Sequence, residues 1–594
     1  MEKLRSSFAA GYACLAAWAD LLDRINVFPV ADGDTGTNLR ISLAPLRDSE
    51  QDGHNICTLL TRRAIGNSGN IAVAFFRELC LAEQMRELAE RVAIGRERAW
   101  QAVATPRKGT MLSVFDSLAG SFTSSDLSDL PSLYSLILPE LQNAVRSTPE
   151  HIPDLKRAGV VDAGALGMYI YFEGFLRSLT DQAGKADSVL SVFNGQLDIQ
   201  RSFLHSKSTE PTDSLQGKQY CVDVILRKKE QRSECQEKSI SDTLRDMGES
   251  VVVLEDESQL KVHIHTDEPE QLYQKVSSLG TVVHWDAEEM REPLGVYSKD
   301  GPGAWISPAN DLSYHILTDA AGSITREAAE QHGISLLDTY IIAGNDARPE
   351  SLCDPAEIYA RQREGGRVTT AQASSFERYQ HYASLIQQFG PCLYLCVGSA
   401  FTGNYAAAMA WKKEHDRNNL LTVVDTGTAS GRLALIALLT SRYMQQGSKS
   451  GEVLSYLRIL MKECREYVFI DELKYLVAGG RISKAGGFFG DLFGVKPVVS
   501  PINNIVQKMG IARSRKGQLA FALEKLKKQV GPAAHPLILL LQYSDNEDWL
   551  REFVLQAIQE LLPAAEIILT PLSLSSGVHM GPGTWAMAFA PKSL

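Results

Sequence analysis

The most informative segment of the N-terminal part is NVFPVADGDTGTN, Asn26–Asn38. Asp32 and Asp34 flank Gly33 in a loop that leads into a predicted helix starting near Thr37. Carboxylate oxygens are hard ligands that suit Mg²⁺. The free N–H groups at the start of a helix bind phosphate. By itself the tripeptide is compatible with two interpretations, a nucleotide-phosphate site or a solvated turn.

The surrounding residues, 1–178, are predicted to be nearly all helical. At the N-terminus the apolar residues recur every three to four positions, as in an amphipathic helix; they are Leu4, Phe8, Tyr12, Leu15, Ala19 and Leu22. Short glycine-rich loops are expected to separate the helices, at 31–38, 66–70, 106–110 and 159–167. Loops at helix ends are where a helical domain can build a polar site.

Four motifs in this order resemble the ATP-binding subunit of dihydroxyacetone kinases and, more closely, the kinase component of bacterial fatty-acid kinases. They are the Asn26–Asn38 stretch, GNSGN at 66–70, PRKGTM at 106–111 and AGVVDAGALG at 158–167. The resemblance implies an all-α helical barrel that binds ATP and two Mg²⁺ ions at one end. Ala31 and Ala165 stand where the family usually has Pro and Gly, and neither change removes a metal ligand.

The same resemblance implies the site residues. Asp32 and Asp34 would hold Mg²⁺, and Asn26 stands where a third ligand falls. The implied nucleotide-lining residues are Thr37, Asn38, Ser68, Gly69, Thr110, Met111 and Asp162. The alternative interpretation of the polar ones is that they cap helices.

A polar stretch at 179–218 is predicted to be a linker, followed by a small α+β domain at 219–300. The expected order is β-α-β-β-α-β, a split βαβ unit. The strands are predicted at 219–226, 250–254, 259–266 and 281–285, and the helices at 239–247 and 269–279.

This middle domain contains a candidate metal site. Cys221 lies in QYCVDV, and His263 and His265 lie in KVHIHT. Residues i and i+2 of a strand point to the same face, and one Cys with two His suits Zn²⁺. The alternative is a pair of partly buried histidines. The segment resembles the middle domain of the fatty-acid kinase component, which carries the same Cys and HxHT pattern. We expect a structural or regulatory role, because the Asp loop already supplies Mg²⁺ chemistry.

Residues 312–594 alternate apolar, β-rich runs with helical runs, which predicts an α/β domain with a largely parallel sheet. The strand-like runs are 314–317, 340–342, 393–397, 421–424, 537–541 and 567–569. Seven segments resemble the DegV-like fatty-acid-binding family: 317–325, 368–374, 397–405, 423–431, 478–500, 512–517 and 577–584.

The DegV-like resemblance implies that an acyl tail is buried between helices and sheet. Burial contributes about 0.8 kcal/mol per CH₂ group. By position, Thr370 and Ser399 would bind the carboxyl group, and Arg481, Arg513 and His579 would lie near it. Several positions depart from the family pattern, which leaves the chain-length preference open; they are Ala320, Ala371, Ala373, Gly398, Ala400 and Asn404.

Composition restricts the function classes. The formal net charge is -11, which argues against a nucleic-acid partner because phosphates attract basic surfaces. The nine cysteines lack CxxC pairs, as in a cytoplasmic protein with reduced thiols. No signal peptide or apolar run of about 18 residues is evident, so we expect at most peripheral membrane contact.

Together these features predict a multidomain fatty-acid kinase that transfers the γ-phosphate of ATP to a fatty-acid carboxylate. Two alternatives remain: a lipid-binding regulatory protein with a nucleotide-sensing domain, and a dihydroxyacetone-kinase-like kinase of a small hydroxyl substrate. We expect ATP and Mg²⁺ as cofactors, a fatty acid as substrate, a homodimer, and a downstream acyltransferase. Acyl preference, and transfer within or between chains, stay open.

Overall fold

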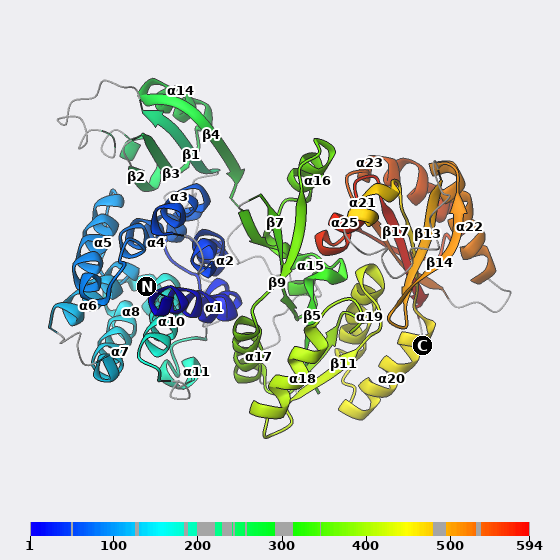
Figure 1. Cartoon of the computed structure of the whole chain (residues 1–594), viewed down its shortest axis with the longest axis horizontal. Helices are drawn as coiled ribbons and strands as arrows, with labels where there is room; N and C mark the ends of the chain where they lie inside the picture. The colour runs from blue at the N-terminus through cyan, green and yellow to red at the C-terminus, as the bar shows by residue number, and fades with distance from the viewer. Residues whose placement is uncertain are drawn as a thin grey trace. The chain divides into compact units, whose positions relative to one another are not determined.

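The computed structural model describes residues 2–48, 52–124, 130–182, 188–198, 220–228, 240, 244–255, 258–290, 313–344, 346–478, 495–529 and 536–592. The chain divides into two compact units, Met1–Ser298 and Lys299–Leu594, whose elements are labelled in Figure 1. Each unit is described by itself.

The first part of the first unit is helical, as predicted. Its described α-helices are α1 (Glu2–Arg24), α2 (Thr35–Leu43), α3 (Gly53–Arg63), α4 (Gly66–Leu79), α5 (Leu88–Ala102), α6 (Met111–Ser124), α7 (Leu130–Arg146), α8 (Thr148–His151), α9 (Pro153–Ala158), α10 (Ala163–Leu179) and α11 (Val189–Val192).

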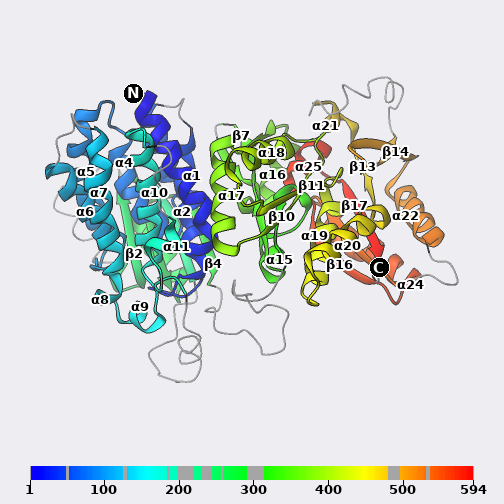
Figure 2. The same cartoon turned by 90° about the horizontal axis from the view of Figure 1, so that it is seen from below.

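Helices α1 and α10 lie side by side at the core of this part (Figures 1 and 2). All six periodic apolar residues of α1 are buried, but every residue from 10 to 19 is buried as well, so the helix is confirmed and its amphipathic character is wrong: α1 is a core helix. A Cβ atom on Gly11 would lie 2.8 Å from the carbonyl oxygen of Tyr171. The two helices approach so closely because Gly11 has no side chain.

Two expectations for this part are wrong. Residues 66–70 do not form a loop but the first turn of α4, and 163–167 begin α10. Gly69, in this turn, allows α4 to pack closely on α2, because a Cβ on Gly69 would lie 2.1 Å from Ser42 Oγ. The predicted linker is also partly folded: α11 is followed by Phe193, which is buried against Tyr169 with ring centroids 5.1 Å apart. Residues 199–219 lie outside the described part.

The middle domain is a four-stranded antiparallel sheet in the order β2-β3-β1-β4. The elements are β1 (Tyr220–Lys228), β2 (Glu249–Glu255), β3 (Gln259–Thr266), α14 (Pro269–Leu279) and β4 (Gly280–Glu289). Of the predicted helix at 239–247, residues 240, 244 and 245 are helical in the part that the structure describes. The split βαβ order is therefore confirmed.

The two faces of this sheet have different neighbours. Because side chains alternate along a strand, Val222 and Ile264 point to the face that packs on Leu272 and Val276 of α14. The opposite face turns to the helical part, where β2 and β3 contact α4 (Figure 1). That second face carries Cys221, Asp223, Lys261, His263 and His265.

The described residues of the second unit form three sheets. A parallel sheet has the order β11-β10-β5-β6, and its strands are β5 (His315–Asp319), β6 (Ile334–Leu337), β10 (Cys392–Cys396) and β11 (Leu421–Asp425). An antiparallel sheet has the order β8-β7-β9, with β7 (Thr339–Ala343), β8 (Asp346–Pro349) and β9 (Val368–Gln372).

The third sheet has the order β14-β13-β12-β17-β15-β16. Its strands are β12 (Arg465–Phe469), β13 (Lys496–Ile502), β14 (Ile505–Ala512), β15 (Leu537–Tyr543), β16 (Glu566–Pro571) and β17 (Trp585–Pro591). All six predicted strands are strands, and the α/β class is confirmed. The prediction of a largely parallel sheet holds for β11-β10-β5-β6 and is wrong for this six-stranded sheet, because β13 and β14 form a hairpin and β17 returns antiparallel between β12 and β15.

Helix α19 (Ser430–Met444) is buried almost throughout and contacts strands of both large sheets. The other helices include α15 (Arg326–Gln331), α16 (Pro355–Arg363), α17 (Ser375–Phe389), α18 (Asn404–His415), α20 (Ser450–Glu463), α21 (Leu473–Ala478), α22 (Arg515–Gln529), α23 (Glu547–Trp549), α24 (Gln556–Leu561) and α25 (Leu574–Met580). Among the described residues, no helix combines the length and apolar character that a membrane crossing requires.

Candidate functional site

The first candidate site is built on the two carboxyl groups between α1 and α2. Gly33 has φ 70°, the left-handed conformation that lets Asp32 and Asp34 converge. Burial, together with the charge of Asp32, raises the pKa of Asp34 to about 7. Burial also raises the pKa of Asp32. Asp34 directly precedes the N-terminus of α2, so the acidic pair lies beside free N–H groups.

The side-chain amide of Asn26 adds to this site. Asn26 donates from Nδ2 to Asp32 Oδ1 at 2.8 Å. Its own Oδ1 is buried and has no partner among the described residues. Oδ1 of Asn67, in the first turn of α4, is likewise buried without a partner among them. Close carboxylates repel each other and need a counter-charge, and Mg²⁺ takes oxygen ligands. The residues at this position therefore fit a divalent cation.

Residues predicted to line the nucleotide tie the start of α2 to α1 and to the start of α4. Thr37 donates to the carboxylate of Asp23 from its backbone N at 3.0 Å and from Oγ1 at 2.8 Å. Ser68 Oγ lies 3.5 Å from the carbonyl oxygen of Thr35. A Cβ on Gly66 would lie 2.1 Å from Asn38 Nδ2. Two helix N-termini thus flank the acidic loop.

The remaining three predicted residues lie at the starts of α6 and α10. Thr110 Oγ1 accepts from the backbone N of Leu112 at 3.4 Å, and Met111 is buried at the start of α6. Asp162 caps α10 by accepting from the backbone N of Ala165 at 2.7 Å. Burial raises the pKa of Asp162 to about 7. Both polar residues therefore have the capping contacts of the alternative interpretation.

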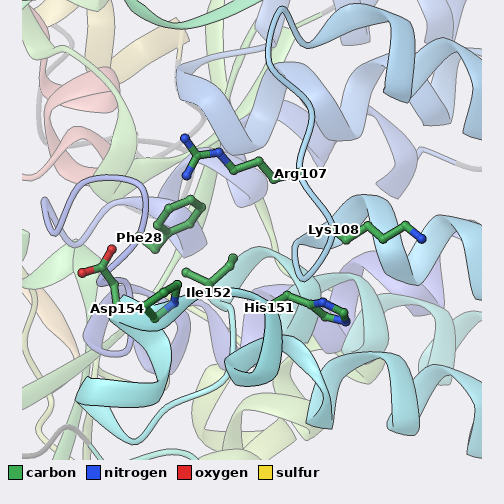
Figure 3. Close-up of a pocket in the computed structure, with 7 residues that line it drawn as sticks. Phe28, Arg107, Lys108, His151, Ile152 and Asp154 are labelled. Carbon is green, nitrogen blue, oxygen red and sulfur yellow. The ribbon is translucent and has the colours of Figure 1, made fainter.

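A cavity of about 270 Å³ opens beside these segments (Figure 3). The guanidinium carbon of Arg107 lies 5.9 Å from the ring centroid of Phe28. The cavity is lined by Phe28, Arg107, Lys108, His151, Ile152, Pro153 and Asp154. Its lining residues come from the segments that precede Asp32, Thr110 and Asp162 in the chain. The cavity combines the aromatic ring of Phe28 with the cationic side chains of Arg107 and Lys108.

The middle domain brings its three predicted ligands together. The ligand atoms of Cys221, His263 and His265 all lie within 4.8 Å of one another, and the two Nε2 atoms are 3.2 Å apart. Burial and the neighbouring His263 lower the pKa of His265 to about 3, so its imidazole is neutral at physiological pH. Neutral imidazole is the form that binds metal, so the residues fit a Zn²⁺ ion.

This cluster is an electrostatic neighbour of the acidic loop. Burial raises the pKa of the Cys221 thiol, and the charges of Asp223, Asp34 and Asp32 raise it further. The sequence did not indicate this proximity, because the two motifs are about 190 residues apart and belong to different domains.

In the second unit, the structure pairs two of the predicted head-group residues. Thr370 Oγ1 on β9 lies 3.2 Å from Nε2 of His579 on α25. Ser399 instead donates its backbone N–H to Asp425 Oδ1 at 3.1 Å. Arg513 follows β14 and is exposed. Arg481 lies outside the described residues.

A buried network near this pair was missed by the sequence analysis. Asp319, at the end of β5, accepts from Tyr394 Oη and Asn404 Nδ2 at 2.7 Å each, and from the Val397 backbone N at 2.6 Å. Arg378 donates from Nη1 to both Asn404 and Gln372, at 2.8 and 3.2 Å. Burial raises the pKa of Asp319 to about 6. The network fixes the loop that carries Ser399. It also fixes the end of β9 at Gln372, two residues beyond Thr370.

Comparisons with known proteins identify three matches along the chain. Residues 29–177 match the DAK2 domain, 217–294 match the FakA-like middle domain of fatty acid kinase, and 313–592 match the uncharacterised DegV family. The chain therefore combines the three kinds of domain that the motifs indicated. The N-terminal matches belong to a kinase-type enzyme family.

Among similar proteins, Protein YloV of Bacillus subtilis strain 168 is 30% identical over 349 residues, which cover 55% of this chain and 62% of that protein. An uncharacterized Staphylococcus saprophyticus protein is 30% identical over 295 residues, 47% of this chain and 53% of that one. The chain thus spans only part of these relatives. A solved fatty-acid-binding DegV family protein of Thermus thermophilus is 23% identical with a TM-score of 0.44, covering 47% of this chain and 99% of that one.

Proposed function

We propose that this chain, which joins a DAK2 domain, a fatty-acid-kinase-like middle domain and a DegV domain, is an ATP-dependent fatty-acid kinase. The observation that carries the proposal is the acidic pair Asp32 and Asp34 with the unpaired oxygen of Asn26. This arrangement has the ligands of a cation that accompanies nucleotide phosphates. The DegV domain supplies the acyl substrate.

In the proposed reaction, an oxygen of the fatty-acid carboxylate forms a bond to the γ-phosphorus of ATP. The bond from that phosphorus to the β–γ bridging oxygen breaks, and acyl phosphate and ADP result. No general base is needed, because a carboxylic acid is already ionised at neutral pH. The residues of the chain therefore act by binding and orienting the two reactants.

The acidic loop and the helix N-termini would hold the nucleotide. Asp32, Asp34 and Asn26 would bind Mg²⁺, which neutralises phosphate charge during transfer. The N–H groups at the starts of α2 and α4 would bind phosphate oxygens. We assign the base and ribose to the cavity beside Phe28 and Arg107, since an aromatic face and a guanidinium both stack on a purine.

The DegV domain would present the acyl carboxylate. Thr370 and His579 are already within hydrogen-bonding distance, and both can donate to a carboxylate. Ser399 lies in the loop fixed by the Asp319 network, and we assign it to the same head group together with Arg481 and Arg513. Because the two reactants are carried by one chain, linkage raises their effective concentration.

The middle domain would bind Zn²⁺ through Cys221, His263 and His265, a ligand set that leaves a fourth position open. Because Asp34 acts electrostatically on Cys221, such an ion would lie near the proposed nucleotide site. We also expect a homodimer and an acyltransferase that consumes the acyl phosphate.

The test is ADP release by the purified chain with Mg·ATP, in the presence and absence of added fatty acids. The proposal predicts release that depends on fatty acid and is lost in Asp34→Ala. Release that depends instead on a small hydroxyl compound would favour a sugar-type kinase. Nucleotide binding without turnover for any acceptor would favour a regulatory lipid-binding protein.

A further inference from the structure

Asp223 makes three hydrogen-bonding contacts, two of which connect the middle domain to the helical part. Its Oδ2 accepts from the backbone N of Gly66 and lies against Nδ1 of His263, both at 3.2 Å. Its Oδ1 accepts from Nδ2 of Asn70 at 3.1 Å. Asp223 is only 8% exposed. One buried carboxylate therefore contacts both the Cys–His cluster and the first turn of α4.

The contact with His263 determines which ring nitrogen of that imidazole carries the proton. An ionised carboxylate only accepts hydrogen bonds, so Nδ1 of His263 carries the proton. Its Nε2 lone pair then faces His265 Nε2, 3.2 Å away, on the side where Cys221 lies. Outer partners of this kind orient a metal-binding histidine and raise its basicity.

The contact with Gly66 fixes the start of α4. Gly66 has φ 63°, and its backbone N–H is one of the donors that a helix leaves without an internal partner. Lys261, which is buried on the next strand, donates from Nζ to the carbonyl oxygen of Ala64. The middle sheet thus holds both sides of the turn that contains Asn67, Ser68 and Gly69.

We propose that Asp223 is a positioning residue that couples cation binding at Cys221, His263 and His265 to nucleotide binding at the start of α4. A cation that fixes His263 also fixes the carboxylate of Asp223, and with it the Gly66 N–H. Binding at one site then favours binding at the other, and the effect is reciprocal. This inference rests on the proposed nucleotide site.

The test uses the full chain in three forms: wild type, Asp223→Asn and Arg245→Ala. The amide in Asp223→Asn has nearly the same shape as the carboxylate, but its NH₂ group would oppose one of the donors that Asp223 now accepts. Arg245 Nη2 donates to the carbonyl oxygen of Ala104 at 2.5 Å, so Arg245→Ala removes a bond between the same two domains away from the cluster. Thermal unfolding checks that the variants are folded.

Two quantities are measured on each form. Co²⁺ is titrated into metal-free protein and followed by its thiolate charge-transfer absorption, which reports on the Cys221 site. Mg·ADP affinity is measured by calorimetry without Zn²⁺ and with one equivalent of Zn²⁺. We expect Zn²⁺ to tighten Mg·ADP binding about fivefold or more in wild type and Arg245→Ala. In Asp223→Asn, this effect should vanish and Co²⁺ affinity should fall about 10- to 100-fold.

Equal Mg·ADP affinity with and without Zn²⁺ in wild type would overturn the coupling and leave the proposed kinase site intact. This wild-type measurement tests the coupling between the two sites even if Asp223→Asn fails to fold. Wild-type Co²⁺ affinity or unchanged coupling in a folded Asp223→Asn would overturn the role of Asp223. Absence of any Mg·ADP binding to wild type would overturn the nucleotide site itself.

Discussion

Asn26 donates from Nδ2 to Asp32 Oδ1 at 2.8 Å, while its own buried Oδ1 has no partner among the described residues. An unpaired buried amide oxygen costs about 1–3 kcal/mol. Bound Mg²⁺ would satisfy this oxygen and both carboxylates at once. The pair Asn26–Asp32 is therefore the local reason to expect a cation here.

The first prediction concerns the acidic pair. Asp32→Asn and Asp34→Asn should each abolish fatty-acid-dependent ADP release, because an amide cannot neutralise the cation. Acyl binding should stay at the wild-type level, since its proposed residues lie in the other unit. Co-purified fatty acid, counted by native mass spectrometry, checks the second point. Wild-type turnover in either variant would contradict the assignment.

A second prediction concerns pH. Burial and the charge of Asp32 raise the pKa of Asp34 from its ordinary value of 3.8 to about 7. The folded carboxyl thus keeps a proton between about pH 4 and 7 that the unfolded chain has lost. The free energy of unfolding of the metal-free protein should therefore receive a contribution that falls as pH rises through this window.

The same proton competes with the cation. Mn²⁺ affinity should rise with pH through about 7. At pH 6 it should be about tenfold weaker than on the plateau above pH 7, where Asp34 is ionised. Asp162→Asn is the matched control, because burial raises the pKa of Asp162 to about 7 as well but its carboxylate caps α10. That variant should keep the pH dependence. Mn²⁺ binding that is flat from pH 5.5 to 7.5 in wild type would rule out this protonation.

Asp162 itself gives a third prediction, on stability. Asp162→Ala removes the acceptor for the Ala165 N–H and should lower the free energy of unfolding by about 1 kcal/mol. Asp162→Asn keeps an acceptor oxygen and should lose less. Denaturant titration of both variants measures the difference. A loss as large in Asn as in Ala would mean that the charge, and not the cap, is what matters.

The fourth prediction concerns the cluster of Cys221, His263 and His265. Elemental analysis should find about one zinc per chain, and Cys221→Ser should lose it, because a hydroxyl is a much weaker zinc ligand than a thiolate. Cys57→Ser is the control, since this half-buried cysteine lies on α3. Fully folded and active protein without zinc would reduce the cluster to core packing.

The fifth prediction concerns the acyl head group. His579→Ala and Ser399→Ala should lower acyl-phosphate formation much more than acyl binding, because the buried tail supplies most of the affinity. A carboxylate displaced by about 1 Å can lose about 100-fold in rate. Thr402→Ala, whose hydroxyl accepts from the Asn404 backbone N, tests for damage to the loop alone. Similar losses in all three variants would indicate a loop effect.

The sequence predicted much of this arrangement, because several signals are local. The alternation in KVHIHT placed His263 and His265 on one strand face, and the DGD loop placed two carboxylates together. Asp223 has the same i, i+2 relation to Cys221, which could have identified it. Its partners Gly66 and Asn70 could not be predicted, since they depend on how a sheet packs on a helix about 150 residues away.

The strand order of the second unit was beyond prediction for a similar reason. Strand β17 is the last in the chain but lies between β12 and β15, where its apolar side chains are buried on both faces. A run of apolar residues shows that a strand is central, but not which neighbours it has or in which direction they run. The expectation of a largely parallel sheet therefore failed for the six-stranded sheet, although β11-β10-β5-β6 is parallel.

Trapping the acyl phosphate tests whether the chain transfers phosphate from ATP to a fatty acid. Purified chain is incubated with Mg·ATP, a long-chain fatty acid and hydroxylamine, and the acyl hydroxamate is counted by mass spectrometry alongside ADP. If the chain phosphorylates fatty acids, we expect one hydroxamate per ADP in wild type and neither product above background in Asp34→Ala. ADP release without hydroxamate from any fatty acid offered, or hydroxamate formation that survives in Asp34→Ala, would contradict it.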